Sequence, residues 1–388
     1  MTQLDSLIRQ ATDWPNSTVS DNEKEVMRQL TVCNACRYCE SFCAVFGAMT
    51  RRLTFAQADV HYLANLCHNC GACLHACQYA PPHEFALNVP RAMARVRVNT
   101  YAQFAWPSAL GQLYHHQSLV FSLALAIGLT LMGSVVMFLS QAADAQNEAK
   151  GFYSVMPHGA MVTLFLPVFA WSLLALAVGV TRFLRAIGPA TTGAALTPPA
   201  GAEALGHALN LTYLDGGHGD GCHNEDDAWT PDRRRAHHLI FYGFLLCFMA
   251  TSVATFYHYG LGWQAPYDFF SLPKVLGITG GAMMVWGTTW IWRLHQTRHA
   301  LHREPSQRDL DLGFIALLFL LAVTGLALMI LRETQLMPGA LVLHLGVVMA
   351  FFLTLPYSKM AHGFYRLAAL LRHSVEKRQP NVLGLADD

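Results

Sequence analysis

The chain has 388 residues, of which 53% are hydrophobic and only 13% carry a charged side chain, and its formal net charge is +1. Soluble globular proteins carry about 25% charged residues, so this composition argues against an ordinary soluble enzyme. The balanced charge also argues against a disordered chain and against nucleic-acid binding. Long apolar runs follow a mixed, cysteine-rich segment of about a hundred residues, so we expect a soluble head followed by a membrane anchor.

The N-terminal residues lack a basic start followed by an apolar core, and we therefore expect no cleavable signal peptide. Without one, the head is expected to stay in the cytoplasm of a bacterium, attached to the inner membrane. Thiols stay reduced in the cytoplasm. The 10 cysteines of the chain therefore favour metal binding over disulfides.

Eight of these cysteines form two copies of the spacing C-x2-C-x2-C-x3-C. The copies are Cys33, Cys36, Cys39, Cys43 and then Cys67, Cys70, Cys73, Cys77. Bacterial ferredoxins with two [4Fe–4S] clusters have this spacing, and the fourth cysteine of each run ligates the other cluster. We therefore predict one cluster on Cys33, Cys36, Cys39 and Cys77, and a second on Cys67, Cys70, Cys73 and Cys43. The alternative is a pair of zinc sites, which normally use two separated cysteine pairs.

The segment between the two cysteine runs, 44–66, contains AQADVHYLANL, which has a helical pattern. The head thus resembles the α-helical ferredoxin type of succinate dehydrogenase iron–sulfur subunits. We assign residues 1–106 to this head and 107–388 to a transmembrane haem-binding domain. No G-x-G-x-x-G fingerprint or nucleophile motif is present, so we expect an electron-transfer subunit rather than a stand-alone catalyst.

Six apolar stretches approach the ~20 residues that cross ~30 Å of hydrocarbon as a helix. They lie near 119–139, 159–184, 239–257, 275–292, 312–331 and 341–357. The predicted fold is therefore all-α, with an α-helical ferredoxin-type head and a six-helix transmembrane bundle. A cytoplasmic head places the loop 185–236 inside. The expected outer loops hold only Lys150, Lys274 and Arg332, which agrees with the positive-inside rule.

Histidines at membrane depth are functional candidates. His344 and His362 are 18 residues apart, which on one helix is five turns and about 27 Å, so both would face one way. The third span begins at His237 or His238 and ends at His258. Helix phase favours His237, because it lies closer than His238 to the helix face of His258. We expect His258 and His344 at the outer level and His237 or His238 with His362 at the inner level. Two imidazoles at one depth suit a six-coordinate haem b. One haem or two remains open, as does a solvated interfacial role.

The segment LHLGVVMAFFLTLPYSKMAH, 343–362, is similar to the last span of the γ subunit of respiratory nitrate reductase. That family has two haem-ligating histidines at this interval, which match His344 and His362. Its other two ligands lie about ten residues apart on an earlier span. Here the residue ten positions after His238 is Phe248, so His258 would substitute or one haem would be absent.

Nearly the whole chain resembles the TcuB/CitB family of tricarballylate and citrate utilisation membrane proteins. The doubled cysteine pattern carries this resemblance, together with CQYAPPHEF at 77–85, DGGHGDGC at 215–222 and HHLIFYGFLLCF at 237–248. It implies a protein that accepts electrons from an FAD-dependent, TcuA-like tricarballylate dehydrogenase and passes them to the respiratory chain, with quinone as acceptor.

Three other functions stay open: a quinol-oxidising subunit that feeds a soluble reductase, an electron donor in aerobic cobalamin synthesis, and a redox-sensing or assembly protein. Cys222 and His223 lie in the predicted cytoplasmic loop. They indicate either a third metal site or a folded cap or docking loop.

Overall fold

The computed structural model describes residues 19–143, 155–188, 196–217 and 219–381. Within these residues the chain is mainly helical, with almost no strand, which confirms the predicted all-α class. The two short strands, β1 (Cys222–His223) and β2 (Trp229–Thr230), pair antiparallel. Lys150, one of the expected outer-loop charges, lies outside the described residues.

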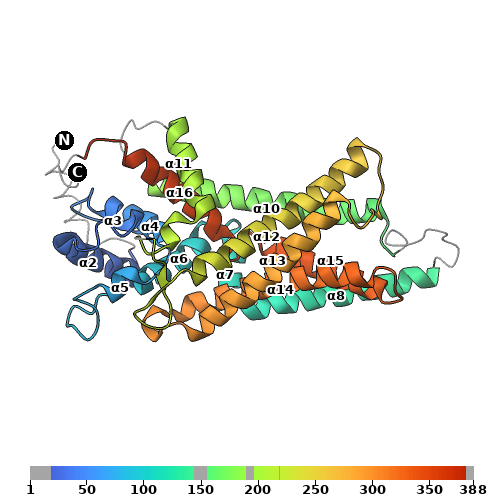
Figure 1. The fold of residues 1–388 in the computed structure, drawn as a ribbon, viewed down its shortest axis with the longest axis horizontal. Coiled ribbons are helices and arrows are strands. Elements are labelled where there is room, and N and C mark those ends of the chain that lie inside the picture. The colour runs from blue at the N-terminus through green and yellow to red at the C-terminus, as the bar shows by residue number, and fades with distance from the viewer. Residues whose placement is uncertain (1–18, 144–154, 189–195, 218, 382–388) are drawn as a thin grey trace.

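The head is built from five helices of the N-terminal segment, all at one end of the molecule (Figure 1). They are α2 (Asp21–Cys36), α3 (Ala44–Met49), α4 (Gln57–Leu66), α5 (Ala72–His75) and α6 (Val89–Phe104). Helix α2 begins with a capping box, in which the Ser20 hydroxyl accepts from the Glu23 amide and the Glu23 carboxylate accepts from the Ser20 amide. The same carboxylate lies 2.8 Å from Nε2 of His61 and so joins α2 to α4.

The C-terminal helix α16 (Ala361–Glu376) returns to this head and completes its core. The Tyr62 hydroxyl of α4 donates to a Glu376 carboxylate oxygen at 2.9 Å, and Arg52 forms an ion pair with the same carboxylate. Tyr101 of α6 and Tyr365 of α16 are both buried, with ring centroids 5.6 Å apart. Residues from the two predicted domains therefore share one core.

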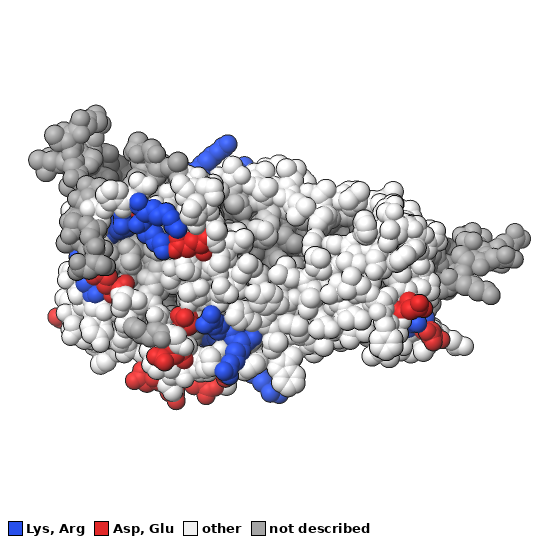
Figure 2. All heavy atoms as spheres, turned by 45° about the horizontal axis from the view of Figure 1, so that its top comes forward, with Lys and Arg blue, Asp and Glu red and all other residues white. Residues whose placement is uncertain are grey.

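Seven helices lead away from the head or connect to it. They are α7 (Ser108–His116), α8 (Ser118–Ala143), α10 (His158–Ile187), α12 (Asp232–Gly260), α13 (Leu272–Thr297), α14 (Pro305–Leu331) and α15 (Met337–Thr354). Figure 1 shows α8, α10 and α12 to α15 extending in one direction from the head. Figure 2 shows charged side chains gathered at the head end, a long face almost free of them, and a small charged group at the far end. This distribution is what a membrane-spanning segment requires.

Five of these helices, α8, α10, α12, α14 and α15, are long and apolar enough to span a membrane. The sixth predicted span, 275–292, falls within α13, which is not among them. Helix α13 packs closely on α12, because a Cβ on Gly280 would lie only 2.6 Å from the carbonyl oxygen of Gly243. Glycines at this contact allow the two backbones to approach, but they add no apolar side chains to α13.

The predicted last span is interrupted before His362. Helix α15 ends at Thr354, and α16 begins at Ala361. Pro356 lies in the connecting turn, and proline disfavours a continuous helix because it lacks an N–H and clashes with the preceding turn. His344 and His362 therefore lie on different helices, and the prediction that both face one way along one helix was wrong.

Candidate cofactor sites

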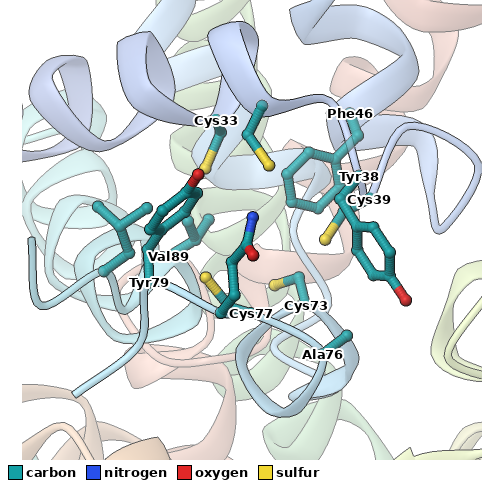
Figure 3. Close-up of a pocket in the computed structure, with 12 residues that line it drawn as sticks. Cys33, Tyr38, Cys39, Phe46, Cys73, Ala76, Cys77, Tyr79 and Val89 are labelled. Carbon is teal, nitrogen blue, oxygen red and sulfur yellow. The ribbon is translucent and has the colours of Figure 1, made fainter. Parts of the chain in front are cut away.

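The first cysteine pocket consists of Cys33, Cys36, Cys39 and Cys77, whose side chains line one cavity of about 280 Å³ (Figure 3). Cys33 and Cys36 come from the last turn of α2, and Cys77 follows α5. Arg37 ends α2 in the left-handed conformation, at φ 57°, and its amide donates to the Cys33 carbonyl at 2.8 Å. This αL cap reverses the chain, so that Cys39 reaches the same cavity.

The second cysteine pocket consists of Cys43, Cys67, Cys70 and Cys73, which also line one cavity. Two positive φ angles turn the chain between Cys67 and Cys73, at Asn69 (φ 56°) and Gly71 (φ 87°). Cys73 lines both pockets, so the two pockets are neighbours. The structure thus brings together the two sets of four thiols that the sequence predicts, including the exchange of Cys43 and Cys77.

The chemistry of these donors fits an iron–sulfur cluster. Burial and the neighbouring thiols raise the pKa of Cys33 and of Cys39 to about 12. The same two causes raise the pKa of Cys73 well above its ordinary value. Thiolates gathered in such a cavity need a positive counter-charge, which the iron of a [4Fe–4S] cluster supplies. Four thiols would also suit zinc, but a fourth cysteine that comes from the other run is the arrangement of two-cluster ferredoxins.

A glycine-rich cap, residues 211–217 and 219–223, covers the second cysteine pocket. Gly216 lines that pocket, and a Cβ on Gly217 would lie 1.8 Å from the carbonyl oxygen of Phe42. Cys222 is fully buried, and it packs with Leu211 and Leu214 against Cys70 of this pocket. The structure therefore shows that this loop folds as a cap over the second cysteine pocket. Its signal in the sequence was the run of glycines.

The inner histidine pair, His237 of α12 and His362 of α16, is the second candidate site. Their ring centroids are 6.0 Å apart, and both side chains are half-buried. His238 turns away from them and packs on Tyr242, with centroids 5.7 Å apart. The structure therefore pairs His362 with His237, which helix phase favours, and not with His238.

The surroundings of the inner histidine pair fit an imidazole-ligated haem. Burial and the neighbouring Arg366 hold the pKa of His362 well below its ordinary value, so this imidazole is neutral, as a metal ligand must be. Arg366 follows His362 by one helical turn and would supply positive charge for haem propionates.

The inner histidine pair is linked to the second cysteine pocket. Arg366 and Arg97 both donate to the carbonyl oxygen of Cys67, at 2.9 and 2.8 Å. His68, the next residue, is buried and lines the second cysteine pocket. Sequence reasoning missed His68, and its position directly after Cys67 was the available signal.

The structure does not bring the two outer candidates together. His258 stacks on His158 at the start of α10, with ring centroids 4.1 Å apart. His344 contacts α14, where its Nδ1 lies 2.9 Å from the Thr324 hydroxyl. His258 and His344, which were expected to form an outer pair, therefore have different neighbours and do not pair. The order of helices in the bundle sets these neighbours, and hydropathy does not reveal that order.

Comparison with known proteins gives two matches to family models and one to a curated protein. The model described as citrate utilization protein B matches residues 112–382, and the model of the Fer4-like domain of that protein matches residues 26–103. The chain is 51% identical, over the full length of both chains, to citrate utilization protein B of Escherichia coli. No solved structure matches the chain.

Proposed function

The chain belongs to the citrate utilization protein B family, and from this we propose that it passes electrons from a reduced FAD-dependent dehydrogenase to membrane quinone. The Fer4-like head supports an iron–sulfur electron-transfer role. In the proposed route the electrons pass two [4Fe–4S] clusters and haem b. We further propose that the donor is a TcuA-like dehydrogenase that oxidises tricarballylate, and that the head lies on the cytoplasmic side of a bacterial inner membrane.

One observation carries this proposal: the three candidate sites form a continuous series. The first cysteine pocket adjoins the second through Cys73. The second pocket is joined to the inner histidine pair by Arg366, which follows His362 by one helical turn and donates to the Cys67 carbonyl. A series of one-electron sites that leads from the head to the base of the long helices is what transfer into a membrane requires.

The residues that would hold the groups are those of the two cysteine pockets and the inner histidine pair. Bound there, clusters and a bis-histidine haem supply one-electron redox chemistry without an open iron position. The protein's own contribution is to exclude water and to place charge. Arg97 is 2% exposed, and together with Arg366 it holds positive charge between Cys67 and His362.

The donor is expected to approach at the first cysteine pocket. Tyr38 lines this pocket and is 69% exposed, so aromatic surface is available beside the thiols. Exposed aromatic side chains are common at protein–protein contacts.

A quinone acceptor is supported by an ion pair near the inner histidine pair. Lys359 Nζ lies 2.6 Å from Asp311 Oδ1, with side chains only 17% and 14% exposed. The Lys359 carbonyl accepts a hydrogen bond from Nδ1 of His362. Reduction of a quinone to a quinol takes up two protons with two electrons. A titratable pair at this position is therefore where a proton would be held.

The test is reduction of the haem in membranes that contain the protein. Reduced dehydrogenase together with tricarballylate should produce the spectrum of reduced haem b, and His362→Ala should abolish this spectrum while iron and sulfide at the head remain. Reduction by quinol but not by the dehydrogenase would instead support the opposite direction, with a soluble reductase as acceptor. A protein without haem, or a haem that neither donor reduces, would contradict the proposal and favour a sensing or assembly role.

A further inference from the structure

A cluster of histidines outside the two cysteine pockets joins three separate parts of the chain. His75 comes from α5 of the head, His223 from β1 of the glycine-rich cap, and His302 from the turn η3 (Ala300–His302) between α13 and α14. The rings of His75 and His223 stack with centroids 4.3 Å apart. Asp227 follows the cap and adds a carboxylate. Neither the electron-transfer series nor the family match explains this cluster.

Three side chains offer ligand atoms that converge on one point. One atom each from His75, His223 and Asp227 lies within 4.8 Å of the others. Nδ1 of His75 is 3.1 Å and Nδ1 of His223 is 4.0 Å from Oδ1 of Asp227. Ligand atoms about 2 Å from a tetrahedral zinc ion lie about 3.3 Å apart, so only a small closure is needed.

His223 gives an independent sign of a missing ligand. Its side chain is only 3% exposed, and its Nδ1 has no hydrogen-bond partner among the described residues. A buried polar atom without a partner is costly, and such atoms are rare in native proteins.

The other nitrogen of His75 has the partner that a metal ligand needs. Its Nε2 lies 3.0 Å from Nε2 of His302. Metal-bound histidines almost always donate their second N–H to an acceptor, which fixes the ring. His302 is fully buried beside Gly71, where a Cβ would lie 2.4 Å from its Cε1, so its ring is held in place to accept.

We propose that His75, His223 and Asp227 bind one divalent transition-metal ion of the zinc class, with His302 as a positioning residue. Imidazole and carboxylate donors suit such an ion better than they suit Mg²⁺ or Ca²⁺. Asp227 is 85% exposed, so the open side of the site faces solvent and water completes the coordination. The ion connects the head to the cap and, through His302, to the α13–α14 connection. It therefore holds the cap over the second cysteine pocket.

The test measures zinc in the full-length protein, purified with its iron and equilibrated with Zn²⁺ before desalting. We expect about one zinc ion per chain, and an X-ray absorption spectrum with nitrogen and oxygen neighbours near 2.0 Å. Zinc misplaced in a cysteine pocket would instead show sulfur near 2.3 Å. The substitutions His223→Ala and Asp227→Asn should each weaken zinc binding at least ~10-fold, and His302→Ala by ~10–100-fold.

The matched control is His83→Ala, which removes another histidine of the head whose ring packs on Tyr79 and Phe85 instead. It should leave the zinc content unchanged. Iron content measured on every variant shows whether the head is folded. The proposal is overturned if the wild-type protein, with its full iron content, retains no zinc, or if its zinc has only sulfur neighbours. It is also overturned if His223→Ala and His83→Ala bind zinc equally well.

Discussion

Substitution of Gly217 by alanine should lift the glycine-rich cap from the second cysteine pocket. Gly217 has φ +94°, and its Cβ would lie 1.8 Å from the Phe42 carbonyl oxygen. The left-handed conformation alone costs an alanine about 1–2 kcal/mol. A side-chain movement cannot relieve the contact with Phe42, because the carbonyl oxygen belongs to the backbone directly before Cys43. The cap must therefore move, and Leu211 and Leu214, now 7% and 6% exposed, would lose part of their burial.

The expected magnitude follows from these two leucines. A fully buried leucine side chain contributes about 1.5–3 kcal/mol. Loss of about half of this burial for both, added to the strain, destabilises the closed cap by roughly 2.5–5 kcal/mol. If iron is lost only when the cap opens, its loss in air from the second cysteine pocket should be at least ~60-fold faster. The assay follows iron release and the cluster EPR signals in anaerobically purified protein after exposure to air.

Gly219→Ala is the matched control. Gly219 has a similar φ of +85°, but nothing lies within 4 Å of the added Cβ. The control should show only the strain, about 1–2 kcal/mol, with at most ~30-fold faster iron loss. Equal rates for the two variants would refute the reasoning, because the contact with Phe42 would then have no effect on the cap.

Three more predictions concern the separate parts of the series. His237→Ala should abolish the haem b spectrum, whereas His238→Ala should retain it, and an absorption spectrum of each purified variant distinguishes them; loss in both would contradict the pairing. Cys36→Ala should remove one set of cluster EPR signals and Cys70→Ala the other, and loss of the same set would contradict the assigned pockets. Burial would raise the pKa of Glu23, but its hydrogen bonds outweigh burial and lower this pKa to about 2. This carboxylate therefore stabilises the head above pH ~4.5, and the contribution is lost as the pH falls towards 2. Glu23→Gln should destabilise the head by about 1–3 kcal/mol at pH 7. In thermal unfolding, the difference from wild type should shrink as the pH is lowered, and a difference that grows would contradict this sign.

The parts of the structure that depend on local spacing could be predicted from the sequence. Local spacing within each cysteine run identified three thiols of each pocket, and the exchange of the fourth cysteine followed from the pattern of two-cluster ferredoxins. The choice of His237 over His238 followed from helix phase, which is also a local property. The five most apolar helices were likewise evident from hydropathy.

The parts that depend on which helices are neighbours could not be predicted in this way. His258 meets His158 because the end of α12 lies beside the start of α10, a contact between residues 100 positions apart. The break before His362 was indicated by Pro356, but counting residues at 100° each across that proline concealed it. His75, His223 and His302 come from three distant segments, and none of the three has a metal-binding spacing by itself.

The return of α16 to the head has a consequence for biogenesis. Glu376 accepts a hydrogen bond from Tyr62, and Leu370 is fully buried in the same core. A ribosome synthesises these residues only after it has synthesised every long apolar helix described above. The nascent iron-binding segment must therefore wait, without its final packing partner, until the translocon has integrated the rest of the chain. Cluster delivery by the cell's assembly machinery is accordingly expected to follow membrane integration.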